Sequence, residues 1–500
     1  MADDTAVLIA VDQGTSSTKT VAVDEHGTVL STTATALGAE HPAPGWVQQD
    51  AREILAGVRA GIDAASERFG ARIAGVGLSS QRESAIAWSR RTGEPLGPVL
   101  GWQDRRTADR AESLADSAGR VRAISGLPLD PMFSALKFAY LLDEIDPDRS
   151  RSRSGEIALG TVDSWLLYAL TGEHRIEVGN ASRTQLLDLA TADWSGELLD
   201  TFGIPAEALP RIAASDEASE IIVGTDGLRF HAVLGDSHAA LFGHGARGAG
   251  AVKVTYGTGS SIMGLEADGA GVSHTGLVRT IAWQTGGAVA RAFEGNILST
   301  GATLVWLAEV LGTTPTELVA LAADAQPSAV DLVPAFSGLG APWWDERATA
   351  VLTGFELGTS RAAIARAAVE SIPLQIEDVL VEADDAAGRV DTILADGGPS
   401  SNDWLVQLQA DLSQRTVVRS GIAELSALGA AHLAGIASGV WSADDVDALP
   451  RSSDTFTPIL GADAASERRA RWLGAVSRSR STPRVDADIP PLSRSTDDRN

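Results

Sequence analysis

The sequence predicts an α/β protein with two domains of similar plan. Its 500 residues, of which 44% are hydrophobic, exceed the ~250–300 residues at which a single core stops growing. Helix-type and strand-type patterns alternate along the chain, which is typical of α/β architecture. The segment AVKVTYGTGSSIMG (251–264) repeats the plan of VLIAVDQGTSSTKT (7–20). Both consist of an apolar strand, a turn of glycine and hydroxylated residues, and a returning strand.

The first half of the chain opens with strands and a helix. The run AVLIAVD (6–12) predicts a short apolar strand that ends in Asp12, and the segment 18–34 predicts a hairpin around the turn EHG. Asp50 and Glu53 have the spacing of a capping box and precede apolar residues at helical spacing. We therefore expect a helix after Asp50 that packs on the sheet formed by the strands.

Later segments divide the chain. RIAGVGLSS (72–80) predicts another buried strand, and the polar stretch 143–156 is interpreted as a surface loop. The glycine-rich stretch GARGAG (245–250) precedes the repeated strand-and-turn plan. We therefore place the domain boundary there, with an N-terminal domain at 1–248 and a C-terminal domain at 249–475.

Two further features lie towards the end of the sequence. The segment ILADGGPSSNDWL (393–405) is a third glycine-rich turn, which again follows an apolar strand and opens a helix. The segment 476–500 is polar, contains proline and lacks hydrophobic periodicity. Such a composition cannot bury enough apolar surface to order a chain, so we interpret 476–500 as a disordered tail.

Composition excludes several classes of function. The chain has no cysteine, which rules out disulfides, thiolate metal sites and cysteine nucleophiles. A formal net charge of -26 opposes phosphate backbones and anionic membranes, so no nucleic acid partner is expected. No apolar run reaches the ~20 residues of a membrane span, and the N-terminus is acidic where a secretory signal is basic. We therefore expect a cytoplasmic protein.

The three glycine-rich turns indicate a site for an anion. Their backbone N–H groups and hydroxyls can converge on a phosphate without bulky side chains in the way. One Gly-Thr turn alone would be interpreted as a simple strand connection, whereas three of the same plan favour a phosphate site. Asp12 and Asp236 stand at the ends of apolar strands, where an unpaired charge is expensive. Each is either a salt-bridged structural residue or part of a site for a Mg²⁺-nucleotide.

An ordered series of motifs over nearly the whole chain resembles the FGGY family of carbohydrate kinases and, within it, the glycerol kinases. The resemblance implies two ribonuclease H-like domains, related to those of actin, Hsp70 and hexokinase, which flank a central cleft where ATP and substrate meet. The motifs are VDQGTSSTKT, PAPGWVQQD, SSQRES, GWQDRRTA, GTVDSWLLYALTGE, NASRTQLLDL, GDSHAALFG, TYGTGS, LVPAFSGLGAPWWD, ESIPLQIEDVL and DGGPSSNDWLVQLQAD.

The resemblance implies ATP and Mg²⁺ as cofactors and assigns residues to them. Asp12 and Asp236 would lie at the metal, and Lys19 stands where the family carries a basic residue after the first loop. Gly301 matches a glycine of the nucleotide pocket. The remaining positions match the first phosphate loop, the second phosphate loop and the adenosine-binding turn, in that order: Gly14, Thr15 and Ser16; Gly257, Thr258 and Gly259; Gly398, Pro399 and Asn402.

The resemblance also implies a catalytic residue and a binding site for a polyol. Asp236 occupies the position of the catalytic aspartate, which accepts or directs the proton of the attacking hydroxyl. Arg82, Glu83 and Trp102 match the residues that hold the substrate in glycerol kinases. A charged pair suits hydroxyl groups and an indole suits CH faces. Without the resemblance, the charged pair would be interpreted as a loop salt bridge and Trp102 as core packing.

Three positions depart from the glycerol kinase pattern. Met132 stands where tyrosine is expected, Ser237 where glutamine follows the catalytic aspartate, and Ser261 where phenylalanine is expected. These changes predict a larger and more polar pocket, and hence a C4–C5 alditol such as erythritol, threitol, xylitol or arabinitol in place of glycerol. Neutral drift in a glycerol kinase is the competing account. His238 is a further candidate beside Ser237, and the favoured interpretation is a histidine that is merely packed in the core or exposed.

Two other functions share many of these motifs. A ketose kinase of the same family, acting on xylulose or ribulose, would differ mainly around Arg82, Glu83 and Trp102. A conformational ATPase of the actin or Hsp70 type would share the phosphate loops and have no use for a polyol site. The resemblance also implies a homodimer or homotetramer. We therefore expect an ATP-dependent polyol kinase that phosphorylates a primary hydroxyl.

Overall fold

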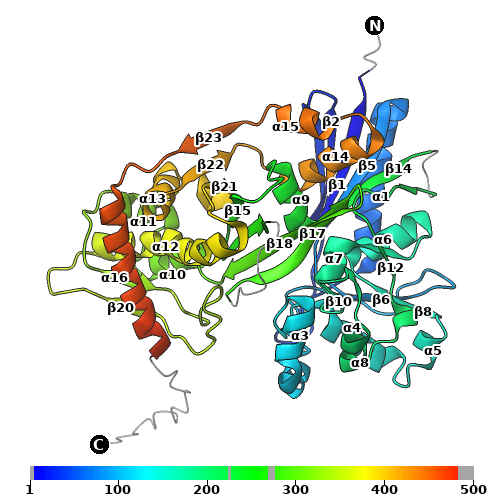
Figure 1. The fold of residues 1–500 in the computed structure, drawn as a ribbon, viewed down its shortest axis with the longest axis horizontal. Helices are drawn as coiled ribbons and strands as arrows, with labels where there is room; N and C mark the ends of the chain where they lie inside the picture. Colours follow the sequence, from blue (N-terminus) through cyan, green and yellow to red (C-terminus); the bar gives the residue numbers. More distant parts are fainter. Residues whose placement is uncertain (1–4, 223–226, 268–275, 482–500) are drawn as a thin grey trace, which may run out of the picture.

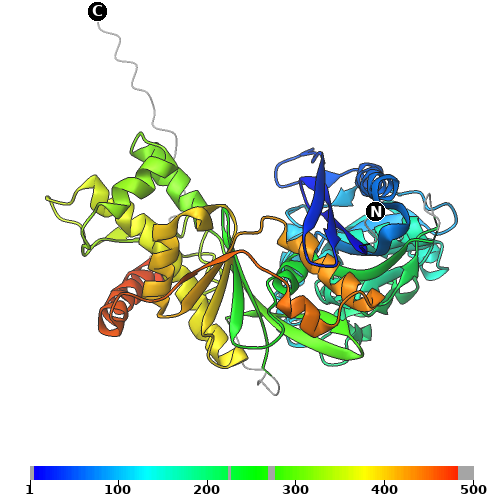
Figure 2. The ribbon, with the colours of Figure 1, turned by 90° about the horizontal axis from the view of Figure 1, so that it is seen from above.

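The computed structural model describes residues 5–222, 227–267 and 276–481. The chain forms two lobes, each built around one large sheet (Figure 1). The first lobe carries an additional group of short strands and helices between residues 82 and 213, which lies beside the first sheet. The first and last described elements, β1 and α16, belong to different lobes (Figures 1 and 2).

The first sheet has six strands in the order β13-β14-β5-β1-β2-β3. β1 and β2 pair antiparallel, as do β2 and β3, while β5 and β14 join parallel to β1 on its other side. The hairpin predicted for residues 18–34 is therefore confirmed. The strands are β1 (Val7–Gln13), β2 (Ser17–Asp24), β3 (Val29–Ala36), β5 (Ile73–Ser80), β13 (Ser219–Glu220) and β14 (Arg229–Gly235).

The second sheet repeats the plan of the first. Its order is β17-β18-β16-β15-β21-β22-β23, with β15 and β16 forming the antiparallel pair and β21 and β22 parallel to β15. The predicted internal repeat and the predicted fold class of two ribonuclease H-like domains are thus confirmed. The strands are β15 (Ala251–Tyr256), β16 (Ser260–Leu265), β17 (Val278–Thr285), β18 (Ala288–Ile297), β21 (Thr392–Asp396), β22 (Thr416–Ser420) and β23 (Ser453–Phe456).

Helices cover the sheets through their apolar faces. α1 (Ala51–Phe69) follows Asp50, whose side chain accepts a hydrogen bond from the backbone amide of Arg52. Its residues Ile54, Val58 and Ile62 are buried in the core of the first lobe. In the second lobe, α12 (Arg361–Ala387) is buried on all sides over its middle, and α13 (Asp403–Ser413) packs its apolar side chains in the same core. Burial of these apolar faces, rather than helix propensity, supplies most of the helices' stability.

The other helices and strands are shorter. The helices are α2 (Ala108–Ser113), α3 (Ala118–Ser125), α4 (Ser134–Ile145), α5 (Ser150–Arg153), α6 (Val162–Thr171), α7 (Val178–Ser182), α8 (Gly196–Phe202), α9 (Asp236–Gly243), α10 (Gly301–Val310), α11 (Pro315–Ala323), α14 (Leu425–Ser438), α15 (Ala443–Ala448) and α16 (Ala462–Ser481). The strands are β4 (Gln48–Gln49), β6 (Ile86–Ser89), β7 (Val99–Leu100), β8 (Ile157–Gly160), β9 (Arg175–Glu177), β10 (Leu187–Asp188), β11 (Asp193–Trp194), β12 (Arg211–Ala213), β19 (Asp331–Val333) and β20 (Val351–Thr353).

Helix α14 crosses from the second half of the chain to the first lobe. It lies on the face of the first sheet opposite α1, and Figures 1 and 2 show it beside β1 and β2. A Cβ atom on Gly429 would lie 1.7 Å from the carbonyl oxygen of Ala239 in α9, so the two helices touch through their backbones. Small residues thus let a helix of the predicted C-terminal domain pack on the sheet of the first lobe.

Two predictions made from the sequence, the loop at 143–156 and the tail from residue 476, need correction. The stretch 143–156, interpreted as a loop, contains the one-turn helix α5. The tail predicted from residue 476 is helical up to Ser481, because Val476 packs with Trp472 in a small apolar cluster of the second lobe. The Ser479 hydroxyl also donates to the carbonyl of Thr349 at 2.6 Å. Residues 482–500 of the predicted tail lie outside the described residues.

One pair of helices resembles a membrane segment in composition. Among the described helices, none is by itself long and apolar enough to cross a bilayer. The pair α10 and α11, bent by 92° at their junction, meets the length and composition test together.

We predict that Gly429→Ala destabilises the protein by at least ~2 kcal/mol, since the added methyl group has to displace backbone rather than a side chain. Urea unfolding of the purified variant measures this change. Gly474→Ala on α16 is the control: a Cβ there meets nothing within 4 Å, so alanine should stabilise by ~0.5–1 kcal/mol. Equal stabilities for both variants would contradict the close packing of α14 on α9.

Candidate active site

Three parallel strands of the first sheet end at one level. β1 pairs with β5 so that Asp12 lies opposite Ser79, and β14 pairs with β5 so that Gly235 lies opposite Ser80. Asp236 follows Gly235 directly and begins α9. Carboxyl ends of parallel strands are where α/β proteins place their ligands. The two aspartates predicted from the sequence are therefore brought together at this edge.

The two aspartates influence each other through their charges. Burial raises the pKa of Asp12 to about 6; the charge of Asp236 adds to the rise, and a hydrogen bond from Ser79 at 2.8 Å opposes it. Burial likewise raises the pKa of Asp236, whereas the Arg82 guanidinium, whose Nε lies 3.3 Å from Oδ1, lowers it. Two close carboxylates are costly to ionise without a nearby cation.

This pair suits a Mg²⁺ ion that arrives with a nucleotide. Among the residues that the structure describes, no group of three or more His, Cys, Asp or Glu could hold a metal. Mg²⁺ in kinases is usually bound by one or two carboxylates together with phosphate oxygens and water. A cation between Asp12 and Asp236 would relieve their repulsion, so the residues present fit the ion.

The first glycine-rich turn connects β1 to β2 and contacts Trp102. The amide of Gly14 donates to the carbonyl of Ser17 at 3.0 Å, which closes the turn. The indole nitrogen of Trp102 donates to Oγ1 of Thr15 at 3.0 Å, so a predicted substrate residue lies beside the predicted phosphate loop. Ser16 completes the turn.

Lys19 has a different partner from the one expected. Its Nζ lies 2.8 Å from Oε2 of Glu424, immediately before α14. The bond attaches β2 to the crossing helix, so a structural role is visible, and the predicted role of Lys19 at a phosphate stays a prediction.

The second and third turns lie together in the second lobe. The amides of Thr300 and Gly301 donate to the carbonyls of Thr258 and Gly257, each at 3.0 Å. A Cβ on Gly301 would lie 2.5 Å from the Gly257 carbonyl, and one on Gly259 would lie 2.3 Å from the Ile297 carbonyl. These positions therefore require glycine, and they place the start of α10 against the second turn.

The third turn follows β21. Gly398 and Pro399 form a single 3₁₀ turn, and the side chain of Asn402 caps α13 by accepting from the amide of Leu405 at 3.0 Å. Gly397 has φ 92° and lies so close to the end of β15 that a Cβ there would stand 2.1 Å from the carbonyl of Tyr256. The second and third turns thus lie side by side in the second lobe, whereas the first turn belongs to the first lobe.

The predicted Arg82–Glu83 pair is part of a larger buried network. Arg82 donates from Nη2 to Oε1 of Glu294 at 2.8 Å, and Glu83 accepts from Nε of Arg183 at 2.6 Å. Nη1 of Arg183 lies 2.8 Å from Oε2 of Glu294. Glu83 has φ 61°, a left-handed conformation that is strained for a residue with a side chain. The charges of the two arginines and the two glutamates therefore compensate each other within the protein interior.

Lys137 joins two segments of the predicted substrate wall. Its buried ammonium group donates to the carbonyl of Gly101 at 2.9 Å and to that of Met132 at 2.6 Å. Trp102 directly follows Gly101, so this lysine places Trp102 and Met132 on neighbouring segments. Burial lowers the pKa of Lys137 to about 7. Sequence reasoning missed this residue, because a lysine is normally interpreted as exposed.

The two serine substitutions lie on different elements. Ser237 follows Asp236 in α9, and its amide donates to Oδ1 of Asp236 at 2.6 Å. Ser261 is in β16 two residues before Met263, which faces Glu294 across the strand pair, so Ser261 and Glu294 share a face of the second sheet. Within the described parts of the chain, the covered Ser261 Oγ has no hydrogen-bond partner.

His238 is fully buried, which decides between the packed and the exposed position that the sequence left open. Its Nε2 lies 3.4 Å from Nη1 of Arg82. Burial and the nearby Arg82 hold the pKa of His238 well below its usual range, so the ring is neutral. A neutral Nε2 can accept from Arg82, and His238 thus contacts the site through this arginine.

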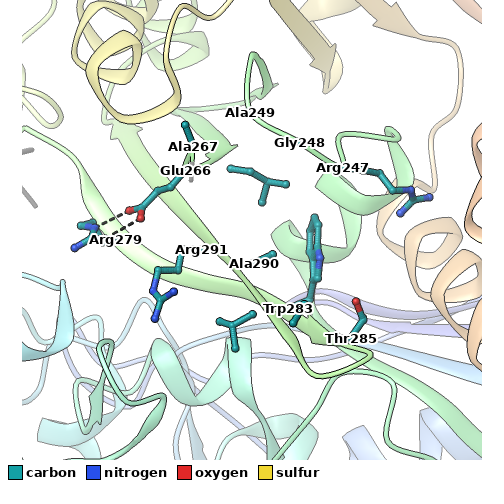
Figure 3. A pocket seen from close by; sticks show the side chains of 13 residues that line it. Arg247, Gly248, Ala249, Glu266, Ala267, Arg279, Trp283, Thr285, Ala290 and Arg291 are labelled. Carbon is teal, nitrogen blue, oxygen red and sulfur yellow. Dashed lines mark hydrogen bonds and ion pairs between the residues drawn. The ribbon is translucent and has the colours of Figure 1, made fainter. Parts of the chain in front are cut away.

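A cavity of about 620 Å³ lies away from these residues, between the β17–β18 hairpin and the connection from α9 to β15 (Figure 3). Three arginines line it, and each has a partner. Arg279 donates two hydrogen bonds to the carboxylate of Glu266, and Nε of Arg247 lies 2.8 Å from Oδ1 of Asp447. Arg291 donates a hydrogen bond to the carbonyl of Leu189. The cavity contains no predicted site residue, so we do not assign it to the reaction.

Comparison with known proteins identifies the family. The model of the FGGY family of carbohydrate kinases, N-terminal domain, matches residues 7–243, and the model of the C-terminal domain matches residues 252–438. The chain belongs to the FGGY family of carbohydrate kinases. It is therefore a phosphotransferase, as the resemblance predicted.

Relatives within the family differ in substrate. The chain is 41% identical over 484 residues to a glycerol kinase of Burkholderia ambifaria, covering 94% of this chain and 97% of the relative. It is 40% identical over 494 residues to an apulose kinase of Pectobacterium atrosepticum, covering 96% and 99%.

Solved structures of the family share the fold. The crystal structure of Plasmodium falciparum glycerol kinase with ADP has a TM-score of 0.90 at 26% identity, covering 95% of this chain and 98% of that chain. A ligand-bound xylulose kinase from Lactobacillus acidophilus has a TM-score of 0.83 at 21% identity, covering 95% and 97%. The second likeness concerns the fold alone.

We predict that Lys137 makes the free energy of unfolding depend on pH in the neutral to alkaline range. Its pKa falls from 10.5 unfolded to about 7 folded, so the unfolded chain binds a proton that the folded chain has released, and folding becomes more favourable as pH rises through this window. Relative to Lys137→Met, the free energy of unfolding of the wild type should rise with pH by up to ~1.4 kcal/mol per unit. Urea unfolding at several pH values measures the difference. Parallel pH dependences would contradict the prediction.

Proposed function

We propose that this kinase transfers the γ-phosphoryl group of Mg-ATP to a primary hydroxyl of glycerol or of a C4–C5 alditol such as erythritol, threitol, xylitol or arabinitol. The observation that carries the proposal is the position of Asp236, at the shared edge of three parallel strands and 3.3 Å from Arg82. A base and a cation at one point suit the activation and orientation of a hydroxyl group.

The substrate's hydroxyls would be held by charged groups of the first lobe. Arg82 and Glu83 present a donor and an acceptor, and Trp102, about a third exposed at 37%, offers a flat apolar surface to the CH groups. Asp236 would accept the proton of the hydroxyl as its oxygen attacks the γ-phosphorus. This division assigns substrate binding chiefly to residues 1–248 and nucleotide binding chiefly to 249–475.

The nucleotide would lie against the glycine-rich turns. Backbone amides of the first turn (Gly14, Thr15 and Ser16) and of the second turn (Gly257, Thr258 and Gly259) suit the phosphates, and Gly301 and the third turn would adjoin the nucleoside. Asp12 and Asp236 would hold Mg²⁺, which supplies positive charge to the phosphate oxygens when bound. Exclusion of water by the two lobes would keep substrate-independent hydrolysis slow.

Three substitutions support an acceptor longer than glycerol. Met132 and Ser237 replace side chains that glycerol kinases use to contact their substrate, and the unpartnered hydroxyl of Ser261 can bind an additional substrate hydroxyl. A buried polar group without a partner is costly, so its satisfaction by substrate favours binding.

A ketose kinase is the second candidate function. The relative named apulose kinase is 40% identical over almost the whole chain, nearly as similar as the glycerol kinase. We therefore keep xylulose and ribulose, and now apulose, as alternative acceptors. The family assignment does not favour a conformational ATPase of the actin type. A cytoplasmic location and a homodimer or homotetramer stay predictions.

The deciding experiment is kcat/KM for ATP-dependent phosphorylation across a panel of acceptors. The panel comprises glycerol, erythritol, the threitols, xylitol, the arabinitols, xylulose, ribulose and apulose. Preference for a four- or five-carbon alditol would support the proposal. Preference for glycerol would show that the three substitutions are compensated, and preference for a ketose would establish the second candidate.

We predict that Asp236→Asn lowers kcat by at least ~100-fold, because the amide cannot accept the hydroxyl proton. Binding of a nonhydrolysable ATP analogue in the absence of added metal, measured by calorimetry, should be retained. Asp63→Asn on the exposed face of α1 is the control and should leave kcat unchanged. A kcat near the wild-type value in Asp236→Asn would remove Asp236 from its proposed role.

We predict that Ser261→Phe lowers kcat/KM for the longer alditols by ~10-fold or more and affects glycerol less, because a ring would fill space that the longer chain needs. Ser261→Ala, which removes the hydroxyl without adding volume, is the matched comparison. The same acceptor panel provides the measurement. An equal loss for all acceptors would contradict a role of Ser261 in selecting substrate length.

A further inference from the structure

Glu294 joins the two lobes through two arginines of the first lobe. It lies in β18 of the second sheet, and its side chain is only 2% exposed. Its Oε1 accepts from Arg82 at 2.8 Å, and its Oε2 lies 2.8 Å from Arg183. Arg82 and Arg183 are likewise buried, at 7% and 1% exposure. Contacts to a buried carboxylate from two guanidinium groups are strong and directional.

The contacts of Glu294 determine which edge of Arg82 faces the catalytic aspartate. Nη1 and Nη2 of Arg82 both lie within hydrogen-bond distance of Glu294, and Nη1 also contacts His238. Nε therefore points towards Asp236 at 3.3 Å and Glu83 at 3.8 Å. Among the described residues this Nε has no hydrogen-bond partner of good geometry. Arg82 thus faces Asp236 with one N–H group and keeps its two-nitrogen edge turned away.

The charges explain why this orientation needs Glu294. Arg82 and Arg183 are compensated by Glu83 and Glu294 within one buried network. Without Glu294, the nearest carboxylates left to Arg82 are those of Asp236 and Glu83. A bidentate ion pair with Asp236 would occupy the carboxylate oxygens that have to receive the substrate hydroxyl. Removal of one member of a buried ion pair leaves the other charge seeking a new partner.

We propose that Glu294 is a positioning residue, which holds Arg82 so that Asp236 and Glu83 remain available to the hydroxyls of the acceptor. This inference rests on the proposed function, because that function assigns Arg82 and Asp236 to the acceptor. β18 runs on from Glu294 to Ile297, whose carbonyl is packed against Gly259 of the second turn. Arg82, which is proposed to hold the acceptor, is therefore anchored on the sheet that carries the proposed nucleotide turns.

The test compares Glu294→Gln with Glu266→Gln. Glu266 directly follows β16 of the same sheet, and its side chain is 6% exposed. It accepts two hydrogen bonds from Arg279 at 2.6 and 2.7 Å but lies outside the proposed site. For the preferred acceptor of the wild type, Glu294→Gln should lower kcat/KM by ~10–100-fold, chiefly by raising the acceptor KM, because supporting contacts of site residues commonly contribute this much. The KM for ATP should stay within ~3-fold, since the substitution changes only acceptor contacts.

The control variant Glu266→Gln should leave both KM values near the wild-type ones. If Glu294→Gln does not accumulate as folded protein, Glu294→Asp replaces it, because aspartate keeps the charge but is too short to hold Arg82 in place. Equal changes of both KM values in the Glu294 variant, or equal effects of the two glutamate substitutions, would overturn the inference.

A double-mutant cycle with Arg82→Met tests whether Glu294 acts through Arg82. In the Arg82→Met background, the further change Glu294→Gln should alter kcat/KM by less than ~2-fold, whereas independent effects would multiply. A multiplicative result would overturn the inference while leaving the proposed function intact. Absence of phosphorylation of every acceptor by the wild type would instead defeat the proposed function.

Discussion

The site depends on the parallel alignment of β1, β5 and β14. Their register places Asp12 opposite Ser79 and Gly235 opposite Ser80, so that Asp12, Arg82 and Asp236 lie at one edge although distant segments supply them. A shift of β14 by one residue would turn its side chains to the opposite face of the sheet. The apolar face of each strand therefore fixes the place of the acidic groups as well as the core.

Buried charge is the main energetic difficulty of this arrangement. Glu83 and Glu294 are buried, Asp12 is half-buried, and the side chain of Asp236 is 38% exposed. An uncompensated carboxylate in the interior would lose several kcal/mol of hydration. Arg82 and Arg183 compensate the two glutamates, whereas the two aspartates keep raised pKa values. The charge of Asp12 and Asp236 is compensated only in part by the protein, which makes this edge suitable for a cation that arrives with a nucleotide.

The lobes are connected by more than the chain between residues 243 and 251. Helix α14 packs by its small residues on the first sheet, and Lys19 pairs with Glu424 just before that helix. On the other side, Glu294 of the second sheet holds arginines of the first lobe. Movement of one lobe against the other would therefore alter contacts of Arg82, which couples the position of the second lobe to the geometry of the proposed acceptor site.

The sequence by itself determined the fold class, the repeated strand-and-turn plan, the glycine-rich turns and the two aspartates at strand ends. These signals are local, since strand periodicity and glycine turns involve neighbouring residues. Only the tertiary structure decided that α14 covers the first sheet, that Lys137 joins Gly101 to Met132, and that Arg82 pairs with Glu294. Arg82 and Glu294 are 212 residues apart in the sequence. No local pattern encodes such a pair, because it exists only once two separately formed sheets have packed together.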